Sequence, residues 1–251
     1  MKTTGNTILI TGGGSGIGRA LAEAFHRQGN QVVIAGRRRD ALDAVVAANP
    51  GMQAAVLDIE DGAAIPGFAA DLIQRFPALD VVLHNAGIMR PEQLREGGLD
   101  TAEHTIATNL LGPIRLNDAL LPHLLAQPAA TIMTVSSGLA FLPLAATPTY
   151  SATKAAIHSY TLSLRHQLKG SSVEVLELAP PYVQTELMGE QQASDPRAMP
   201  LAEFIEEVMA IIAAGPEHGE ILVERVKALR NAEANGNFHS FFTSFNEAMS
   251  H

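Results

Sequence analysis

The chain has 251 residues, of which 47% are hydrophobic and 17% charged, and this composition suits one α/β domain with a sizeable core. The formal net charge of −9 argues against nucleic acid and anionic membranes as partners, because both would repel an acidic surface. The absence of cysteine excludes disulfides, thiolate nucleophiles and cysteine-ligated metals.

The first predicted element is a buried strand at residues 7–11, followed by a glycine-rich loop and a helix at residues 16–28. Glycines permit a tight turn and the close approach of a phosphate, while the helix N-terminus attracts its negative charge. The alternative is a flexible glycine turn without a ligand. The pattern predicts a pyrophosphate-binding loop made by Gly12, Gly14, Ser15, Gly16, Ile17 and Gly18.

Strands and helices alternate along the rest of the chain, which predicts a doubly wound, Rossmann-type parallel sheet with helices on both faces and a single domain spanning residues 1–251. Strands are expected near residues 7–11, 31–35, 52–57, 79–84, 130–135 and 172–178. Helices are expected near residues 16–28, 39–48, 61–75, 100–126, 149–168 and 200–214.

Beyond Gly215 the pattern is weaker. Residues 220–224 could form a closing strand, and residues 226–234 read as a helix capped by Asn235 and Gly236. We therefore treat residues 226–251 as an atypical helical tail. Its four phenylalanines between residues 238 and 245 are too apolar for a free tail, so we expect them to pack on the body or on a partner subunit.

The residues that follow each strand deserve inspection, because ligands of a doubly wound sheet lie across the carboxyl ends of its strands. Arg37 follows the second strand, where an acidic residue would bind a ribose hydroxyl and an arginine would accommodate a 2′-phosphate. Arg37 therefore indicates NADP(H) more than NAD(H), unless it only belongs to a solvated helix turn. Further polar or small residues follow the next three strands: Asp58, then Asn85, Ala86 and Gly87, then Ser136 and Ser137.

Tyr150 and Lys154 are four residues apart, so a helix would place the phenol and the amine on one face. A tyrosine that exchanges protons near neutral pH needs a neighbouring positive charge to stabilise its anion. Such a pair is common by chance, so its weight comes from the other motifs.

Taken together, these motifs resemble the short-chain dehydrogenase/reductase (SDR) family, from the Thr11–Gly18 loop to about Thr185. The shared elements are the glycine loop, Asp58, Asn85 to Gly87, Asn109, Ser137, and Tyr150 with Lys154. Two departures, Pro180-Pro181 in place of Pro-Gly and the unusual segment at residues 221–230, resemble the DltE-type branch of bacterial oxidoreductases. The resemblance implies hydride transfer between a nicotinamide and a carbonyl or alcohol carbon.

The resemblance also assigns roles to four catalytic residues. Tyr150 would be the general acid/base, and Lys154 would lower its pKa and hold the nicotinamide ribose. Ser137 would hydrogen-bond the substrate carbonyl. Asn109 would hold a water that relays protons towards Lys154, or else it is an ordinary residue on a long helix.

For the cofactor, the resemblance implies that Asp58 contacts the adenine and that Asn85 to Gly87 brace the sheet beside the ribose. The backbone of Val183 and the side chain of Thr185 would bind the nicotinamide carboxamide. Pro181 removes a backbone donor and fixes φ near −65°, so the local loop shape is open.

Two segments should border the substrate: residues 138–147, which are mostly apolar, and residues 186–199, which form either a mobile lid or a plain surface loop. The first segment favours a small apolar carbonyl compound. The nine histidines lack paired spacing typical of metal sites, so we predict no metal.

The sequence thus predicts an NADP(H)-dependent oxidoreductase acting on a small carbonyl or alcohol. A dinucleotide-binding sensor without catalysis is the alternative, and a Rossmann-like methyltransferase is a weaker one. No apolar stretch has signal or membrane-spanning length, so we expect a cytoplasmic protein. Small residues at Ala152, Ala155, Ala156 and Ser159 suggest a homodimer, with a tetramer also possible.

Overall fold

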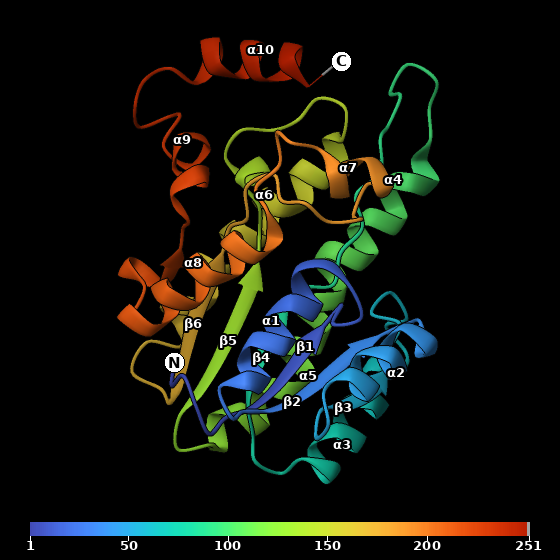
Figure 1. The fold of residues 1–251 in the computed structure, drawn as a ribbon, viewed down its shortest axis with the longest axis vertical. Helices are drawn as coiled ribbons and strands as arrows, with labels where there is room; N and C mark the ends of the chain where they lie inside the picture. The colour runs from blue at the N-terminus through green and yellow to red at the C-terminus, as the bar shows by residue number, and fades with distance from the viewer. Residues whose placement is uncertain (250–251) are drawn as a thin grey trace.

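The computed structural model describes residues 1–249 as a seven-stranded parallel sheet in the order β3-β2-β1-β4-β5-β6-β7 (Figure 1). This order is that of a doubly wound fold and confirms the predicted class. The last two residues of the predicted tail, 250 and 251, lie outside the described residues. The strands are β1 (Thr7–Thr11), β2 (Gln31–Gly36), β3 (Gln53–Val56), β4 (Leu79–His84), β5 (Ala130–Val135), β6 (Val173–Leu178) and β7 (Glu220–Ile221).

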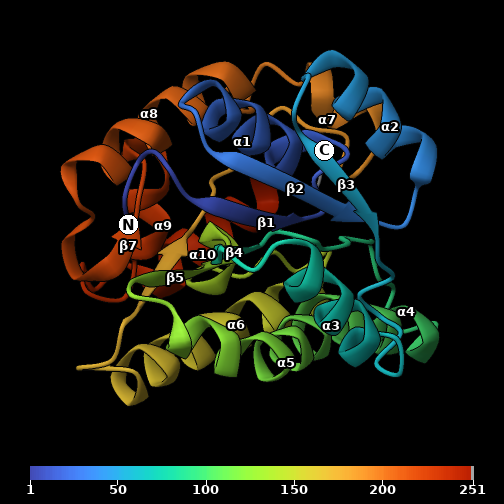
Figure 2. The ribbon, with the colours of Figure 1, turned by 90° about the horizontal axis from the view of Figure 1, so that it is seen from below.

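Helices cover both faces of the sheet, with α1, α2 and α8 on one side and α3, α5 and α6 on the other (Figure 2). The α-helices are α1 (Gly16–Arg27), α2 (Arg39–Ala48), α3 (Ile65–Arg75), α4 (Leu99–Ile106), α5 (Gly112–Ala126), α6 (Pro148–Gln167), α7 (Glu190–Ser194), α8 (Leu201–Ala214), α9 (Lys227–Arg230) and α10 (Phe238–Ala248).

Two apolar clusters fill the spaces between the sheet and its helix layers. Alternate side chains of one strand point to opposite faces, so Ile8 and Ile10 of β1 join the cluster beneath α1 and α8, whereas Leu9 joins the cluster beneath α3 and α5. All three side chains are fully buried. A strand buried on both faces explains why the sequence of β1 is a continuous apolar run.

The strand order reverses at β1, which pairs with β2 on one side and with β4 on the other. The connections from these two strands leave in opposite directions, which opens a crevice beyond their carboxyl ends. The glycine loop after β1 and the Asn85 turn after β4 lie side by side at this point.

Several predicted boundaries differ from the structure, and the closing strand considered at residues 220–224 shortens to β7 (Glu220–Ile221). The helix expected at residues 100–126 is divided into α4 and α5 by a π-helical turn, Ala107–Leu111. Helix α3 begins at Ile65 instead of residue 61, because Asp61 Oδ1 accepts hydrogen bonds from the backbone of Ala63 and Ala64 and forms a turn there. The helix expected at residues 226–234 shortens to α9, and a turn follows it.

The tail ends in α10, which lies beyond the carboxyl end of the sheet (Figure 1). Asn246 anchors it, since the Asn246 side chain accepts a hydrogen bond from Ala145 N at 2.6 Å and donates one to Pro143 O at 3.2 Å. Arg197 Nη1 donates to Ala248 O at 3.4 Å. The helix therefore connects residues 143–145 with the predicted lid. No helix among residues 1–249 is long and apolar enough to cross a membrane.

Candidate active site

The glycine loop is shaped by two close backbone approaches. Gly12 has a φ of 68°, and a Cβ there would lie 2.9 Å from Ala86 Cα. A Cβ at Gly18 would lie 2.3 Å from Asn85 Nδ2 and 2.4 Å from Gly12 O. These distances are far below van der Waals contact, so only glycine allows the loop, the first turn of α1 and the Asn85 turn to pack together.

The other side of the loop is open towards the crevice. A Cβ at Gly14 or Gly16 would meet no atom closer than 3.5 Å, and Ser15, Gly16 and Ile17 line the main cavity at the N-terminus of α1. The first amides of a helix have no partner within the helix and, with the helix dipole, attract an anion. This donor set and the space beside it match a dinucleotide pyrophosphate.

The Asn85 turn is fixed to the same loop by hydrogen bonds. Asn85 Nδ2 donates to Thr11 O at 3.1 Å, and the backbone amides of Asn85 and Ala86 both donate to Thr11 Oγ1 at 3.1 Å. The carboxyl ends of β1 and β4 are thereby held as one rigid edge of the crevice.

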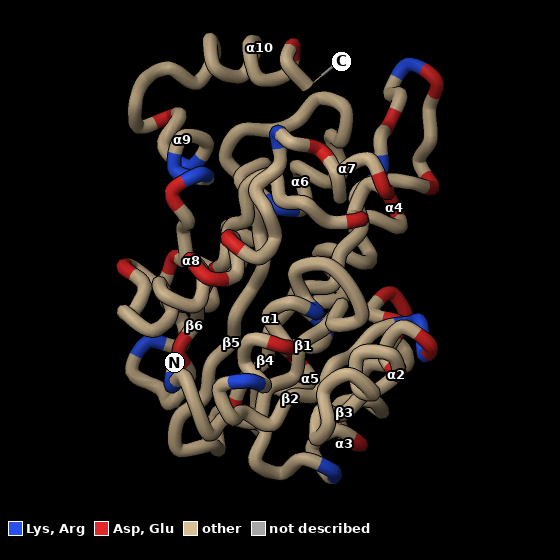
Figure 3. The backbone as a smooth tube through the Cα atoms, in the orientation of Figure 1, with Lys and Arg blue, Asp and Glu red and all other residues tan. Residues whose placement is uncertain are grey.

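Two arginines line a second cavity of about 180 Å³ that adjoins the main one along Gly12, Ser15, Ala86 and Gly87. Arg37 and Arg38 both line it, and Arg38 Nη2 donates to Ser15 Oγ at 3.3 Å. In Figure 3 the blue segment at the start of α2 marks these residues. The sequence pattern singled out Arg37, but Arg38 is the arginine that contacts the glycine loop.

Asp58 differs from the other predicted cofactor residues. Its neighbours Leu57 and Ile59 line the second cavity, whereas Asp58 is exposed and its Oδ1 accepts a hydrogen bond from Glu60 N at 3.1 Å. The structure therefore places Asp58 at the margin of the crevice and not on its wall.

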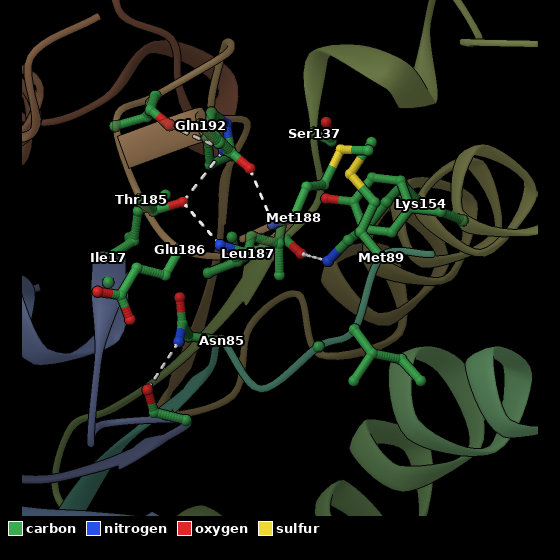
Figure 4. Close-up of a pocket in the computed structure, with 18 of the residues that line it drawn as sticks. Ile17, Asn85, Met89, Ser137, Lys154, Thr185, Glu186, Leu187, Met188 and Gln192 are labelled. Atoms are coloured by element: carbon green, nitrogen blue, oxygen red, sulfur yellow. Dashed lines mark hydrogen bonds between the residues drawn. The ribbon is translucent and has the colours of Figure 1, made fainter. Parts of the chain in front are cut away.

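Ser137, Tyr150 and Lys154 converge on a cavity of about 500 Å³, a size ordinary for small-molecule sites (Figure 4). Ser137 follows the end of β5, and the first turns of α6 carry the other two. Lys154 Nζ lies 5.5 Å from the centre of the Tyr150 ring and donates to Val135 O at 2.8 Å. Three of the four predicted catalytic residues therefore line the same cavity.

Burial controls the protonation of this set. Loss of solvent raises the pKa of Tyr150 to about 12, although its hydrogen bond with Ser137 opposes the shift. Burial also disfavours the charged form of Lys154 and lowers its pKa to about 8, whereas the negative charge of Glu177 acts to raise this pKa. Desolvation of the phenolate therefore outweighs the help of its neighbours and holds the pKa of Tyr150 above its ordinary value, against the lowering that the resemblance implies.

Asn109 lies in the π-helical turn and is 2% exposed, so it is not a solvent-facing helix residue. Its side chain pairs with the backbone of Ile88, accepting from Ile88 N and donating to Ile88 O, both at 2.9 Å. Asn109 Nδ2 also lies 3.3 Å from Thr153 Oγ1. The side chain therefore ties the segment after β4 to α6, and it does not line the cavity.

Val183 and Thr185 line the main cavity, and Thr185 lies beside the glycine loop, because a Cβ at Gly16 would be 3.6 Å from Thr185 Cβ. Gln192 of α7 binds both, since its Nε2 donates to Val183 O at 2.9 Å and to Thr185 Oγ1 at 3.1 Å (Figure 4). The preceding Pro180 accepts a hydrogen bond from Gly138 N at 2.8 Å, so the two prolines leave the loop anchored. Gln192 was missed by sequence reasoning, because nothing in its spacing marks it as the organiser of this loop.

The remaining wall consists of residues that carry no motif. Residues 88–91, after the Asn85 turn, and residues 186–188, after Thr185, close the cavity from two sides. In the view of Figure 4, the side chains of Met89 and Met188 extend towards Ser137. Methionine is apolar and flexible, so these two side chains form an adaptable wall next to Ser137.

The family model described as short chain dehydrogenase matches residues 6–196. The chain belongs to the short-chain dehydrogenase family. It is 39% identical over 237 residues to the uncharacterized oxidoreductase DltE of Bacillus subtilis, covering 92% of this chain and 93% of that protein. The expected family and branch are confirmed, and the chain is an oxidoreductase of this family.

Two solved structures show the same architecture. A serine dehydrogenase complexed with NADP+ in its closed form is 27% identical and has a TM-score of 0.76, covering 86% of this chain and 92% of that one. A short chain dehydrogenase/reductase from Burkholderia phymatum in complex with NAD is 25% identical and has a TM-score of 0.71, covering 95% and 89%. Relatives of this fold thus bind either dinucleotide.

Proposed function

We propose that the protein is an NADP(H)-dependent oxidoreductase that interconverts a small apolar carbonyl compound and its alcohol. The observation that carries the proposal is the convergence of Ser137, Tyr150 and Lys154 on the cavity that the glycine loop also lines. A proton donor, an oxygen-binding hydroxyl and a dinucleotide loop in one cavity are the parts that carbonyl reduction requires.

In the proposed reaction, the bound nicotinamide supplies the hydride for reduction or accepts it in oxidation. Ser137 Oγ hydrogen-bonds the carbonyl oxygen, on which negative charge grows as the carbon is reduced. The Tyr150 hydroxyl gives its proton to this oxygen. With a pKa of about 12, Tyr150 holds that proton at neutral pH, which suits an acid in the reducing direction.

The cofactor-binding assignments follow the walls of the two cavities. The α1 N-terminus would hold the pyrophosphate, Asn85 to Gly87 would border the ribose, and Lys154 would hold the nicotinamide ribose. Thr185, fixed by Gln192, would bind the carboxamide. Asp58 would contact the adenine only from the rim, given its exposed position.

NADP(H) is proposed over NAD(H) because Arg37 and Arg38 line the smaller cavity next to Ser15. A 2′-phosphate placed there would meet two guanidinium groups, which bind phosphate through charge-assisted hydrogen bonds. NAD(H) carries only an uncharged hydroxyl at that position, so it lacks the anion that two guanidinium groups would bind.

Residues 186–199 are proposed as a lid over the substrate. The two ends of the segment are tied together, because Met199 N donates to Tyr182 O and Gln184 N donates to Met199 O. Between these ends, Leu187 and Met188 are 41% and 39% exposed, although both also line the cavity. Apolar side chains at the mouth of a cavity would be covered by closure over a substrate.

A Tyr150→Phe variant tests the catalytic proposal against the sensor alternative. The variant should bind NADPH as the wild type does but lose a factor of roughly 10² to 10⁴ in turnover, the usual contribution of a general acid. Turnover is followed by NADPH absorbance with a panel of ketones and aldehydes, and binding by fluorescence titration. Unchanged turnover would remove Tyr150 from the mechanism, and no turnover of any carbonyl by the wild type would favour the sensor.

We also propose a cytoplasmic homodimer that uses no nucleic acid and no membrane as partner. On α6, Ala152, Ala155 and Ser159 are exposed and form a smooth surface of small side chains. Such a surface allows the same helix of a second copy to approach closely around a two-fold axis.

A further inference from the structure

A carboxylate is buried in the layer between the sheet and α6. Glu177 is 1% exposed and follows Val173 and Val175 at alternate positions of β6. Those two valines belong to the apolar cluster that includes Leu164 of α6. A charged group among apolar positions is unfavourable unless other groups compensate it, so Glu177 is an unusual residue for simple packing.

Two partners on α6 explain how the charge is accommodated. His158 Nδ1 lies 2.9 Å from Glu177 Oε2 and 3.0 Å from Oε1, which fixes the carboxylate. Lys154 lies one turn before His158 on the same helix face. On the neighbouring strand β5, Thr134 pairs with Glu177 in register, and the next residue, Val135, accepts the hydrogen bond from Lys154 Nζ. The carboxylate and the ammonium therefore share one small region beneath α6.

The other charged groups around Glu177 are accounted for. Glu220 of β7 pairs with Glu177 in register, and Arg230 binds both of its oxygens at 3.0 and 3.2 Å. Arg165 of α6 donates to two backbone carbonyls, Val175 O at 2.9 Å and Gly219 O at 3.1 Å. The charge of Glu220 is balanced by an arginine, whereas that of Glu177 is directed towards His158 and Lys154.

We propose that Glu177, held by His158, is a positioning residue of the active site that keeps the amine of Lys154 protonated. This inference rests on the proposed function only in making Lys154 part of the catalytic set. Neither Glu177 nor His158 lines the cavity, so both act through Lys154.

The electrostatics of the site agree with this geometry. Burial lowers the pKa of Lys154 to about 8, and the attraction of Glu177 acts in the opposite direction. Removing the carboxylate should therefore lower the pKa of Lys154 further, and the ammonium would then be lost closer to neutral pH. The proposed function needs that ammonium for the cofactor ribose and for the Tyr150 anion.

The protein has only four lysines, Lys2, Lys154, Lys169 and Lys227, so the amine can be titrated directly. With ε-carbon-13 lysine, NMR spectra of the protein without cofactor show one signal per lysine, and Lys154→Met identifies the relevant one. In Glu177→Gln the titration midpoint of Lys154 should fall by about 1 pH unit or more, as expected for the loss of a nearby opposite charge. In Glu177→Asp, which keeps the charge, it should return towards the wild-type value.

Glu174→Gln is the matched control, because Glu174 lies on the same strand but on its opposite face and is exposed. This variant should leave the Lys154 titration unchanged. A Glu177→Gln midpoint equal to that of the wild type, or an equal change in Glu174→Gln, would overturn the proposal. The measurement needs no turnover, so it can fail or succeed independently of the proposed reaction.

A metal ion is the competing explanation for this cluster, because ligand atoms of His158, Glu177 and Glu220 lie within 4.8 Å of one another. The ion pair between Arg230 and Glu220 argues against a metal ion, since a bound cation would have to displace the Arg230 guanidinium from the Glu220 carboxylate. Zinc added to protein treated with EDTA should leave the melting temperature unchanged. A rise that disappears in His158→Gln would assign the carboxylates to a metal and overturn the proposed role.

In the enzyme assay, the same effect should appear as a shift of the alkaline limb of kcat/KM to lower pH in Glu177→Gln. In Glu177→Asp, which keeps the charge, the alkaline limb should return towards its wild-type pH. A purely structural role of Glu177 would instead lower the activity equally at all pH values. A uniform loss of activity with no shift of the limb would contradict the inference.

Discussion

Arg37 and Arg38 are adjacent in sequence but differ in their surroundings. Both line the smaller cavity, and only Arg38 also donates to Ser15 of the glycine loop, at 3.3 Å. A guanidinium already anchored beside the phosphate-binding loop loses less freedom when it binds a ligand. Specificity for the 2′-phosphate should therefore be shared between the two, and Arg38 should contribute at least as much as Arg37.

Replacing either arginine by aspartate should lower the preference for NADPH over NADH. A charge-assisted hydrogen bond contributes about 1.5 to 3 kcal/mol, which corresponds to roughly 10- to 100-fold in the ratio of affinities. The ratio of affinities is measured by fluorescence titration with both dinucleotides. Arg39→Asp is the control, because the side chain of Arg39 binds Asp43 and does not line the smaller cavity. An unaltered ratio in both Arg37→Asp and Arg38→Asp would mean that the 2′-phosphate assignment is wrong.

His84 at the end of β4 should make the protein sensitive to acid. Burial lowers its pKa to about 4, although the hydrogen bond to Asn117 Oδ1 at 2.7 Å opposes this shift. The unfolded chain binds the proton near the ordinary pKa of 6.5, so stability should fall as the pH drops from 6.5 to 4, by roughly 3 kcal/mol in total.

Melting temperatures between pH 7 and pH 4.5 check this dependence. His84→Asn should be less stable than the wild type at pH 7 but should lose less stability on acidification. His166→Asn, which changes an exposed histidine of α6, should follow the wild-type curve. A wild-type curve that is flat across this range would contradict the prediction.

The residues of the candidate site could be found from the sequence where each belongs to a local motif, as do the glycine loop, Ser137 and the Tyr150–Lys154 pair. Gln192 and Glu177 could not, because their importance comes from contacts that only the folded chain makes, of Gln192 with Val183 and Thr185 and of Glu177 with His158. A glutamine in a loop and a glutamate in a strand carry no local signal. The burial of Tyr150 could not be predicted from the motif either. The spacing of one helical turn places Lys154 on the same helix face as Tyr150, but it does not determine how much of the phenol is removed from solvent.

At the scale of elements, the strand, glycine loop and helix at residues 7–28 form a unit whose shape is set by close contacts. Gly18→Ala should destabilise the protein without cofactor by about 1 to 3 kcal/mol, because its methyl group would overlap the backbone oxygen of Gly12. Gly14→Ala is the matched control, since its methyl group would meet only side-chain and backbone atoms of Ala41 and Leu42 at 3.5 Å or more, which is ordinary van der Waals contact. Equal melting temperatures for the two variants would show that the loop has room to adjust.

Buried strands could be predicted from the sequence better than irregular helical turns. Strands β1 to β6 were predicted to within about two residues, because a run of buried apolar residues has a clear beginning and end. The π-helical turn at Ala107–Leu111 was not, because a change of hydrogen-bond partner leaves the apolar periodicity almost unaltered. That turn carries Asn109, and its buried side chain is held by the backbone of Ile88.

At the scale of the whole molecule, the exposed small residues of α6 lead to a prediction about assembly. A two-fold axis on this helix would bring each side chain near its own copy, so Ala155→Arg would place two positive charges together in a tight interface. The variant should elute as a monomer in size-exclusion chromatography with light scattering, and the wild type as a dimer. Ala210→Arg on α8, which covers the opposite face of the sheet, should leave the assembly unchanged. A dimeric Ala155→Arg would place the interface elsewhere.

Helix α10 joins two parts of the chain that are far apart in sequence, through Asn246 to residues 143–145 and through the backbone of Ala248 to Arg197. Its phenylalanines are only half-buried, and Phe238 stacks on Phe242 instead of entering the core. Half-buried aromatic side chains stabilise α10 less than a buried core would, because less apolar surface is removed from water. An alcohol cosolvent should therefore detach α10, and with it the contacts to residues 143–145 and Arg197, before it unfolds the buried core.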